Sequence, residues 1–349
     1  MKRPAPSRVP FSVEALAAGV GAGQRRALAK AITLVESTRA DHQEAAQRLL
    51  EALLPQTGGA VRVGVSGVPG VGKSTFIEAF GLHLIGIGKR VAVLAVDPSS
   101  ARSGGSILGD KTRMSRLAVA PEAFIRPSPA AGSLGGVARR TREAMLVCEA
   151  AGYDVVLVET VGVGQSEYAV ASMVDFFLVL LLAGAGDELQ GMKRGILELA
   201  DALAIHQADG DNLGRATRAA AEYRSALNLL RPRTASWDPP VLTVSALESR
   251  GIDRVWAVIE DYRARLGASG ELAAKRRQQQ QEWLWAMIDD GLKQHFLSRS
   301  DVARLLPEIE AAVRAATLTP TEGARRLLAL LGARRGGEAA PASHQARRG

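Results

Sequence analysis

The apolar positions of the chain change their period along its length. Between Ser12 and Leu54 they recur at helical spacing, which predicts two or three helices. Beyond residue 56, short apolar runs of strand length alternate with helical stretches or loops. The predicted strands are Val61–Ser66, Val91–Val96, Val155–Glu159, Phe176–Leu182, Ala202–Ile205 and Val241–Val244. This order predicts the α/β class, with a doubly wound, mostly parallel sheet covered on both faces.

The pattern after the last predicted strand is helical. A helix over Asp253–Leu266 is expected to close the sheet domain, and a charged stretch then leads into a long helix with an apolar face that includes Trp283, Trp285 and Phe296. That face must cover something, and both a dimer partner and the chain's own sheet domain are open alternatives. Shorter helices are expected over Asp301–Leu331.

These patterns divide the chain into four parts. We expect an N-terminal helical extension over residues 1–55, with a flexible arm at its start, and a sheet domain over residues 56–267. A C-terminal helical arm should follow over residues 268–332, and a disordered tail over residues 333–349, where no core-forming pattern exists.

Composition narrows the function classes. The 349 residues are 47% hydrophobic, which suffices for a real core, and carry a formal net charge of +8. A net positive charge can indicate a nucleic-acid partner, an anionic membrane partner or a solvated Arg-rich surface without such a partner. Because aromatic residues are only 4% of the chain, stacking on oligonucleotides is disfavoured, and we expect no nucleic-acid partner.

The apolar runs and the cysteine content indicate neither a membrane span nor a disulfide within the chain. The longest apolar run, Phe176–Ala183, is far shorter than the roughly 20 residues of a membrane span, so we expect no membrane partner. No signal peptide is apparent. The single cysteine, Cys148, allows no disulfide within the chain, which fits a reducing cytoplasm, the predicted location.

The chemistry starts at a glycine-rich segment between the predicted strand Val61–Ser66 and a predicted helix over Thr75–Ile85. It has the form Gly-x4-Gly-Lys-Ser, which is the phosphate-binding loop of P-loop NTPases in its required context. Its backbone N–H groups and the following helix N-terminus would hold phosphate oxygens, Lys73 would reach the β- and γ-phosphates, and Ser74 would face Mg²⁺. The predicted nucleotide-binding residues here are Gly67, Val68, Pro69, Gly70, Val71, Gly72, Lys73, Ser74 and Thr75.

Other candidate catalytic and metal-binding residues follow two further strands. Glu159 ends an apolar strand where a Walker B carboxylate sits, and Gly162 follows it at the spacing of the Asp-x-x-Gly switch of GTPases. After the strand Val91–Val96, a small polar loop carries Asp97 and Asp110, which could approach the metal. Arg113 in the same loop could supply charge to the transition state.

A base-recognition segment follows the strand Ala202–Ile205. GTPases usually carry Asn-Lys-x-Asp there, and this chain has His206, Gln207, Ala208 and Asp209. Asp209 retains the acceptor for the guanine N1–H and exocyclic amine. Because the shorter Gln207 replaces the lysine stem that lies on the base, we expect GTP binding with looser base selectivity. The segment Ser245, Ala246 and Leu247 stands where GTPases support the base.

The order of these segments resembles one family. The chain reads VDPSSARSGGSILGDKTRM, VETVGVGQSE, LLAGAGDELQGMKRGILELAD, ADGDN and TVSALESRGID, which over roughly residues 10–332 is similar to the MeaB/ArgK family. Those proteins are G-protein chaperones of adenosylcobalamin-dependent acyl-CoA mutases. The long loop segments are far more specific than the phosphate loop alone.

The resemblance implies a GTPase that couples GTP binding and hydrolysis to the loading, protection and reactivation of a mutase cofactor. It implies Mg²⁺ near Ser74, Asp97, Asp110 and Glu159, and a homodimer formed by the C-terminal arm. It also implies that Gly184–Gly195, with Lys193, is an extra switch loop coupled to the mutase. The residues expected to serve catalysis are Lys73, Asp110, Arg113, Glu159 and Gly162, and the expected ligands are GTP or GDP with Mg²⁺.

Three other functions remain as alternatives. A metal-insertion GTPase of the nickel type shares the fold, but the chain has one cysteine and scattered histidines in place of a ligand cluster. A P-loop small-molecule kinase would need a lid and an acceptor pocket, and no such segment stands out. A nucleic-acid translocase or targeting GTPase would fit the basic charge but not the low aromatic content.

Overall fold

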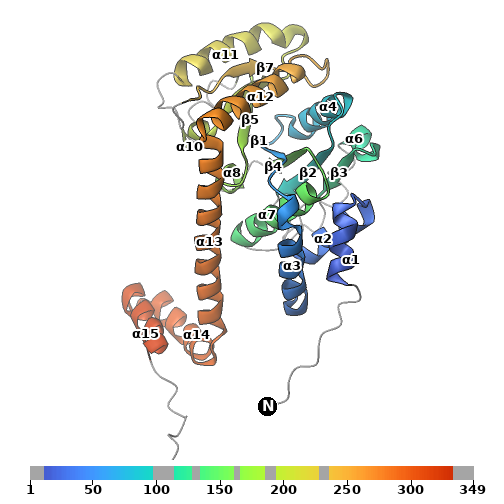
Figure 1. Cartoon of the computed structure of the whole chain (residues 1–349). Coiled ribbons are helices and arrows are strands. Elements are labelled where there is room, and N and C mark those ends of the chain that lie inside the picture. The colour runs from blue at the N-terminus through green and yellow to red at the C-terminus, as the bar shows by residue number, and fades with distance from the viewer. Residues whose placement is uncertain are drawn as a thin grey trace, which may run out of the picture. The chain divides into compact units, whose positions relative to one another are not determined.

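The computed structural model describes residues 12–96, 114–127, 134–160, 166–184, 194–227 and 236–332. Within these residues seven strands form one sheet in the order β3-β2-β4-β1-β5-β6-β7, and every neighbouring pair is parallel (Figure 1). The strands are β1 (Val61–Gly67), β2 (Val91–Val96), β3 (Ala123–Arg126), β4 (Val155–Thr160), β5 (Phe176–Leu182), β6 (Ala202–His206) and β7 (Val241–Thr243). The predicted parallel α/β fold is confirmed.

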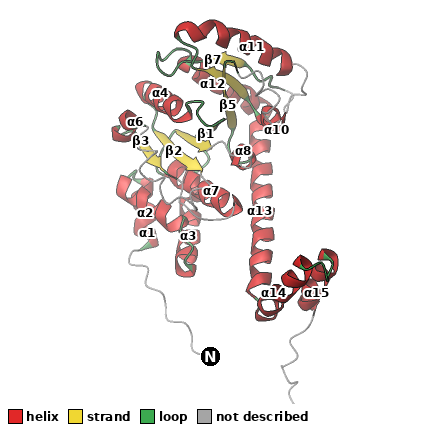
Figure 2. Ribbon diagram, turned by 180° about the vertical axis from the view of Figure 1, so that it is seen from behind, coloured by secondary structure: helices red, strands yellow, loops and turns green. Residues whose placement is uncertain are grey.

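Helices precede, separate and follow the strands (Figure 2). The helices that come before the first strand or between strands along the chain are α1 (Val13–Gly21), α2 (Arg25–Val35), α3 (Ala40–Leu53), α4 (Lys73–Gly86), α6 (Ser115–Val119), α7 (Leu134–Ala150), α8 (Ser166–Ala171), α10 (Arg194–Leu199) and α11 (Leu213–Leu227). Those after the last strand are α12 (Ile252–Ser269), α13 (Glu271–Ser298), α14 (Ser300–Arg314) and α15 (Pro320–Gly332). Short 3₁₀ turns occupy Leu54–Gln56 and Gly210–Asn212.

Both faces of the sheet are covered by apolar side chains, as continuous apolar strands require. Along β4, Val156 and Val158 pack into one cluster with α1–α3, α7, α8 and α11, and Val155 and Leu157 pack into the other with α4, α6 and α12. The N-terminal helices therefore share a core with the sheet. Leu28, Ile32, Leu49 and Leu53 of α2 and α3 are buried in that shared cluster.

The sequence patterns missed one strand. β3 is a four-residue strand at the edge of the sheet, paired only with β2 among the described strands, and its last residue, Arg126, is partly exposed. A strand this short lacks a long apolar run, so its sequence cannot be told from a loop. Helix α4 also begins at Lys73, earlier than the predicted Thr75, so Lys73 and Ser74 lie in its first turn.

The topology positions the candidate site at one edge. β1 lies between β4 and β5, and β6 and β7 continue the sheet beyond β5. Because all these strands are parallel, their carboxyl ends meet at the same edge, where open α/β sheets bind their ligands. The segments after β1, β6 and β7 carry most of the described residues predicted to bind nucleotide, and Glu159 lies near the carboxyl end of β4.

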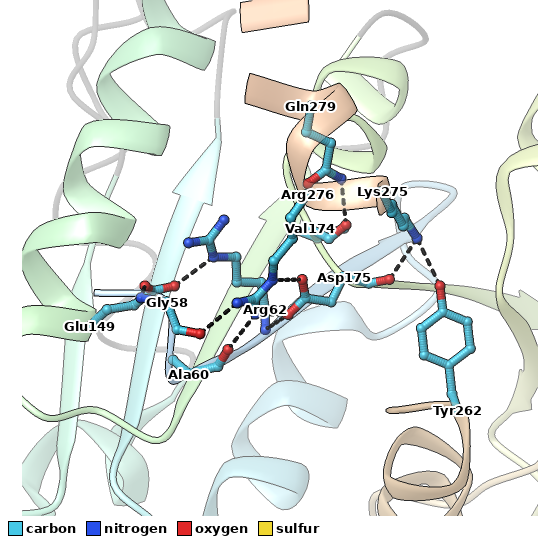
Figure 3. Close-up of polar contacts among 10 residues, drawn as sticks. All are labelled: Gly58, Ala60, Arg62, Glu149, Val174, Asp175, Tyr262, Lys275, Arg276 and Gln279. Carbon is cyan, nitrogen blue, oxygen red and sulfur yellow. Dashed lines mark hydrogen bonds and ion pairs between the residues drawn. The ribbon is translucent and has the colours of Figure 1, made fainter. Parts of the chain in front are cut away.

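The described chain separates into two compact units, Met1–Gln281 and Glu282–Gly349. The first turns of α13 belong to the first unit and are bound to the opposite, amino-terminal edge of the sheet (Figure 3). The Arg276 guanidinium donates two 2.7 Å hydrogen bonds to the buried Asp175 carboxylate, and Lys275 Nζ donates to the Asp175 carbonyl at 2.6 Å. Arg276 also donates to the carbonyls of Gly58 (2.5 Å) and Ala60 (2.8 Å) before β1.

The second unit contains the rest of α13 with α14 and α15. A small core of Val302, Ile309 and Leu327, with Phe296 packed against it, holds these helices together. Large apolar side chains of this unit are exposed, with Leu284, Trp285 and Leu292 each between 58% and 63%. Among the described residues, none of the helices combines the length and the apolar character that crossing a membrane demands.

Candidate functional site

The phosphate loop joins β1 to α4 and its shape depends on glycine. Gly67 has φ +151°, and a Cβ there would lie 2.6 Å from the Leu180 carbonyl oxygen of β5. Gly72, the N-cap of α4, has φ +92° in the left-handed region, and a Cβ there would lie 2.8 Å from the His206 ring. Side chains at either position would collide with the neighbouring strand ends, so the close turn over the helix N-terminus requires glycine.

Lys73 lies inside this loop and is only 8% exposed. Its ammonium group donates to the carbonyls of Gly67 (2.7 Å) and Val68 (3.1 Å). Burial lowers the pKa of Lys73, whereas the carboxylates of Glu159 and Glu167 act in the opposite direction. A lysine curled over its own loop in this way presents a cation where phosphate oxygens of a nucleotide would bind.

Ser74, in the first turn of α4, meets Glu159 of the strand β4, which neighbours β1. Glu159 of β4 pairs in register with Val65 of β1, which brings the ends of the two strands together. The Ser74 hydroxyl donates to the Glu159 carboxylate at 3.0 Å. A buried hydrogen bond from the Thr160 hydroxyl to the Ser66 hydroxyl, at 3.0 Å, joins the ends of β4 and β1.

These two groups fit a magnesium ion. A hydroxyl and a carboxylate in hydrogen-bonding contact are hard oxygen donors of the kind Mg²⁺ prefers, and they lie beside the predicted phosphate cradle. Among the described residues no cluster of three or more His, Cys, Asp or Glu side chains is arranged around a metal position. The other two predicted ligands, Asp97 and Asp110, lie outside the described residues, as do Arg113 and Gly162.

Glu167 is a buried acid that sequence reasoning gave no role. It lies in the first turn of α8, is 2% exposed, and acts electrostatically on Lys73. Its only signal in the sequence was its position eight residues after Glu159, and that spacing alone implies no contact with the phosphate loop.

The predicted base-recognition residues meet at the ends of β6 and β7. The Ser245 hydroxyl donates to the Asp209 carboxylate at 2.5 Å and accepts from the Glu248 backbone N–H at 3.1 Å. The Ala208 N–H donates to the Val244 carbonyl at 3.0 Å. These bonds orient the Asp209 carboxylate, which can accept from paired N–H donors such as those on one edge of guanine.

The remaining members of this segment differ in exposure. Leu247 is 85% exposed, Ala246 is partly buried, and Gln207 is exposed with φ +57°, a left-handed backbone that is uncommon outside glycine. His206 is 3% exposed and its Nδ1 lies 2.7 Å from the Val71 carbonyl oxygen of the phosphate loop. The structure thus brings the predicted base-recognition segment into direct contact with the phosphate loop.

The loop after β5 is described only at its two ends. Gly184 and Gly195 are placed, and residues 185–193, including Lys193, lie outside the described residues. The predicted switch role of Gly184–Gly195 therefore stays a prediction, as do the roles of Asp97, Asp110, Arg113 and Gly162.

A parallel sheet with a glycine-rich loop at the end of its central strand, a lysine curled into that loop and a carboxylate on the next strand define a P-loop nucleotide hydrolase. The profile of the family described as "Methylmalonyl Co-A mutase-associated GTPase MeaB" matches residues 28–301. The chain belongs to this MeaB family of GTPases, and GTP hydrolysis is its activity.

Individual relatives agree with the family. The GTPase ArgK of Escherichia coli is 53% identical over 305 residues, which cover 87% of this chain and 92% of that protein. The methylmalonic aciduria type A homolog of Mus musculus, described as mitochondrial, is 49% identical over 329 residues, covering 90% of this chain and 79% of its own length. A solved structure described as a LAO/AO transport system kinase is 44% identical, with a TM-score of 0.74 over 92% of this chain and 98% of that chain.

Proposed function

We propose that the chain is a GTP-driven chaperone of an adenosylcobalamin-dependent acyl-CoA mutase, in which GTP binding and hydrolysis gate cofactor loading, protection and reactivation. The observation that carries this proposal is the family match over residues 28–301, because the family is described as mutase-associated. The name of the mouse relative, which refers to methylmalonic aciduria, supports the same partner. We place this function in the cytoplasm, in keeping with the single, unpaired cysteine, Cys148.

The described residues suggest how the phosphates are held. The backbone N–H groups of Gly67–Thr75 and the N-terminus of α4 would cradle the phosphates, with Lys73 moving from its loop carbonyls to phosphate oxygens. Ser74 and Glu159, together with Asp97 and Asp110, would hold Mg²⁺. A bound Mg²⁺ would neutralise charge on the β- and γ-phosphate oxygens. We propose that Arg113 and Gly162 act at the γ-phosphate.

The base is proposed to be guanine, read by the Asp209 carboxylate in the orientation set by Ser245. Gln207 lacks the long aliphatic stem of lysine, so it covers less of the base surface. The selectivity for guanine is therefore lower than in GTPases that keep Asn-Lys. His206, Ala246 and Leu247 complete the proposed base site.

A binding and turnover experiment tests the mutase partnership. Purified methylmalonyl-, ethylmalonyl-, isobutyryl- and 2-hydroxyisobutyryl-CoA mutases would each be presented to the immobilised chain with a non-hydrolysable GTP analogue or with GDP. We expect one mutase to bind in a nucleotide-dependent way and to raise GTP turnover by about tenfold or more, because switch GTPases turn over slowly without a partner. Absence of both binding and stimulation with all four enzymes would contradict the proposal.

We also propose that the C-terminal helices form a homodimer. Leu284, Trp285 and Leu292 expose an apolar surface on α13, which a second copy would remove from water. Light scattering after size exclusion should give about twice the 36.8 kDa chain mass for the wild type, and a monomer for the variant Trp285→Glu with Leu292→Glu.

The matched control for the dimer experiment is Val119→Glu on α6, an apolar residue that is 81% exposed in the other unit. This variant should keep the dimer mass. A wild-type chain that elutes as a monomer at micromolar concentration would overturn the dimer proposal.

A further inference from the structure

The side chain of His206 joins two segments that are 135 positions apart in the sequence. It leaves the carboxyl end of β6 and its Nδ1 lies 2.7 Å from the carbonyl oxygen of Val71, which is fully buried in the phosphate loop. Asp209, the proposed guanine reader, follows His206 by three residues. The bond therefore joins the part of the site that would hold the base to the part that would hold the phosphates.

The protonation of the ring follows from its contacts. A carbonyl oxygen can only accept, so Nδ1 must carry the hydrogen and donate it to Val71. Burial lowers the pKa of His206, against the smaller opposing effects of the Val71 hydrogen bond and the Asp209 charge, so the ring is neutral near pH 7. Nε2 is then an unprotonated nitrogen, and it is buried with no hydrogen-bond partner in the described part of the chain.

The ring also takes up the space above the loop. A Cβ added to Gly72 would lie 2.8 Å from His206 Cε1 and 2.9 Å from Nδ1, and 3.9 Å from the Gln207 side-chain amide. The ring also meets Phe76 of α4 edge-on, with centroids 6.1 Å apart and planes at 86°. Any displacement of the phosphate loop against β6 must break the Val71 bond or push Gly72 into the imidazole ring.

We propose that His206 is a positioning residue that holds the Asp209 segment in register with the phosphate loop, so that base and phosphates are bound by one rigid unit. The imidazole performs this role where GTPases usually carry asparagine, donating through Nδ1–H and filling the space over Gly72 with its ring. The inference rests on the proposed reading of guanine by Asp209. Its consequence is that removing the ring lowers base discrimination more than phosphate binding.

Affinities for GDP and IDP test this role. IDP lacks the exocyclic amine whose hydrogen bond Asp209 would accept, but it carries the same phosphates as GDP. The ratio of the two dissociation constants therefore measures base recognition separately from phosphate binding. We expect the wild type to favour GDP by on the order of tenfold or more, as for one hydrogen bond to a charged group. His206→Ala should bring the ratio to within about twofold of one, and His206→Asn, which keeps an N–H donor, should preserve most of the preference.

The control is His83→Ala, a histidine of α4 that has no part in the proposed site, and it should leave both affinities and their ratio unchanged. If the wild type does not distinguish GDP from IDP, guanine reading by Asp209 fails. If the wild type distinguishes them and His206→Ala does so equally well, the positioning role of His206 is overturned and guanine reading stands.

A spectroscopic measurement keeps the inference testable if the alanine variant does not fold. The chain has five histidines, so long-range ¹H–¹⁵N correlation spectra of ¹⁵N-histidine-labelled protein are tractable. The ring signals that disappear in His206→Asn should show the neutral tautomer with hydrogen on Nδ1 at pH 7. A ring that carries hydrogen on Nε2, or on both nitrogens at that pH, contradicts the proposed bond.

Discussion

Replacing Lys73 with alanine is expected to abolish measurable GTP turnover, with a loss on the order of 100-fold or more, the scale of removing one preorganised charge contact from a transition state. Lys73 is the buried cation of the loop, and its ammonium group donates hydrogen bonds to the loop carbonyls of Gly67 and Val68. A nucleotide phosphate would be a stronger partner than either carbonyl. Steady-state phosphate release, measured with saturating GTP, gives the rate.

The fold should survive this substitution, because the burial of Lys73 lowers the pKa of its amine and its removal takes a desolvated cation out of the loop. Circular dichroism melting of both proteins checks this point. Lys30→Ala on the exposed surface of α2 is the matched control and should turn over GTP at the wild-type rate. Wild-type hydrolysis in Lys73→Ala would refute the assignment of the loop.

Replacing Asp175 with alanine is expected to destabilise the unit Met1–Gln281 by about 3–5 kcal/mol, the usual cost of breaking a buried ion pair. The Asp175 side chain is completely buried and accepts from the Arg276 guanidinium and from the Arg62 backbone N–H at 3.0 Å (Figure 3). Its loss leaves the largely buried Arg276 cation without its carboxylate. The free energy of unfolding from urea titration, followed in the transition of this unit, measures the effect.

The same bonds predict a pH dependence. Burial by itself would raise the pKa of Asp175, but the Arg276 hydrogen bonds and charge, with Arg62, lower it below the ordinary 3.8. A lowered folded-state pKa means that the stabilisation is complete above the unfolded-state value and is lost as the pH falls through the folded one. The difference in stability between wild type and Asp175→Ala should therefore shrink only in strong acid.

Asp261→Ala is the control for the Asp175 experiment. Asp261 pairs with Arg265 one turn along α12, but their side chains are 48% and 59% exposed, so the pair contributes about 0.5 kcal/mol or less. If Asp175→Ala is no more destabilising than Asp261→Ala, the network at the start of α13 does not stabilise the fold.

Much of the fold was predictable because burial on both faces leaves a direct signal in the sequence. Val155–Leu157 and Phe176–Leu181 are continuous apolar runs, since alternate residues pack into the two clusters on either side of the sheet. β3 was missed because four residues at an edge produce no such run. The ends of helices were also shifted, as at α4, because the phosphate loop passes directly into its first turn at Lys73.

Some residues of the candidate site could likewise be predicted from the sequence, and others could not. The phosphate loop could be identified from eight consecutive residues because its chemistry uses the backbone of one continuous turn. Glu159 and Asp209 could be proposed from the sequence because they lie at the ends of apolar strands whose carboxyl ends must meet. The burial of Glu167 beside Lys73 was not predictable, because it depends on where α8 packs, which no local spacing specifies.

By itself the sequence determined the class of fold, the phosphate loop and the family, because each of these depends on local periodicity or on contiguous segments of the chain. Only the tertiary structure decided that His206 bonds to Val71 and that Asp175 binds Arg276, across 135 and 101 positions of sequence. Such contacts depend on the order and register of strands, and many pairings of histidine, acid and arginine are compatible with the same pattern. The three-dimensional packing of β1, β5 and β6 selects one of them.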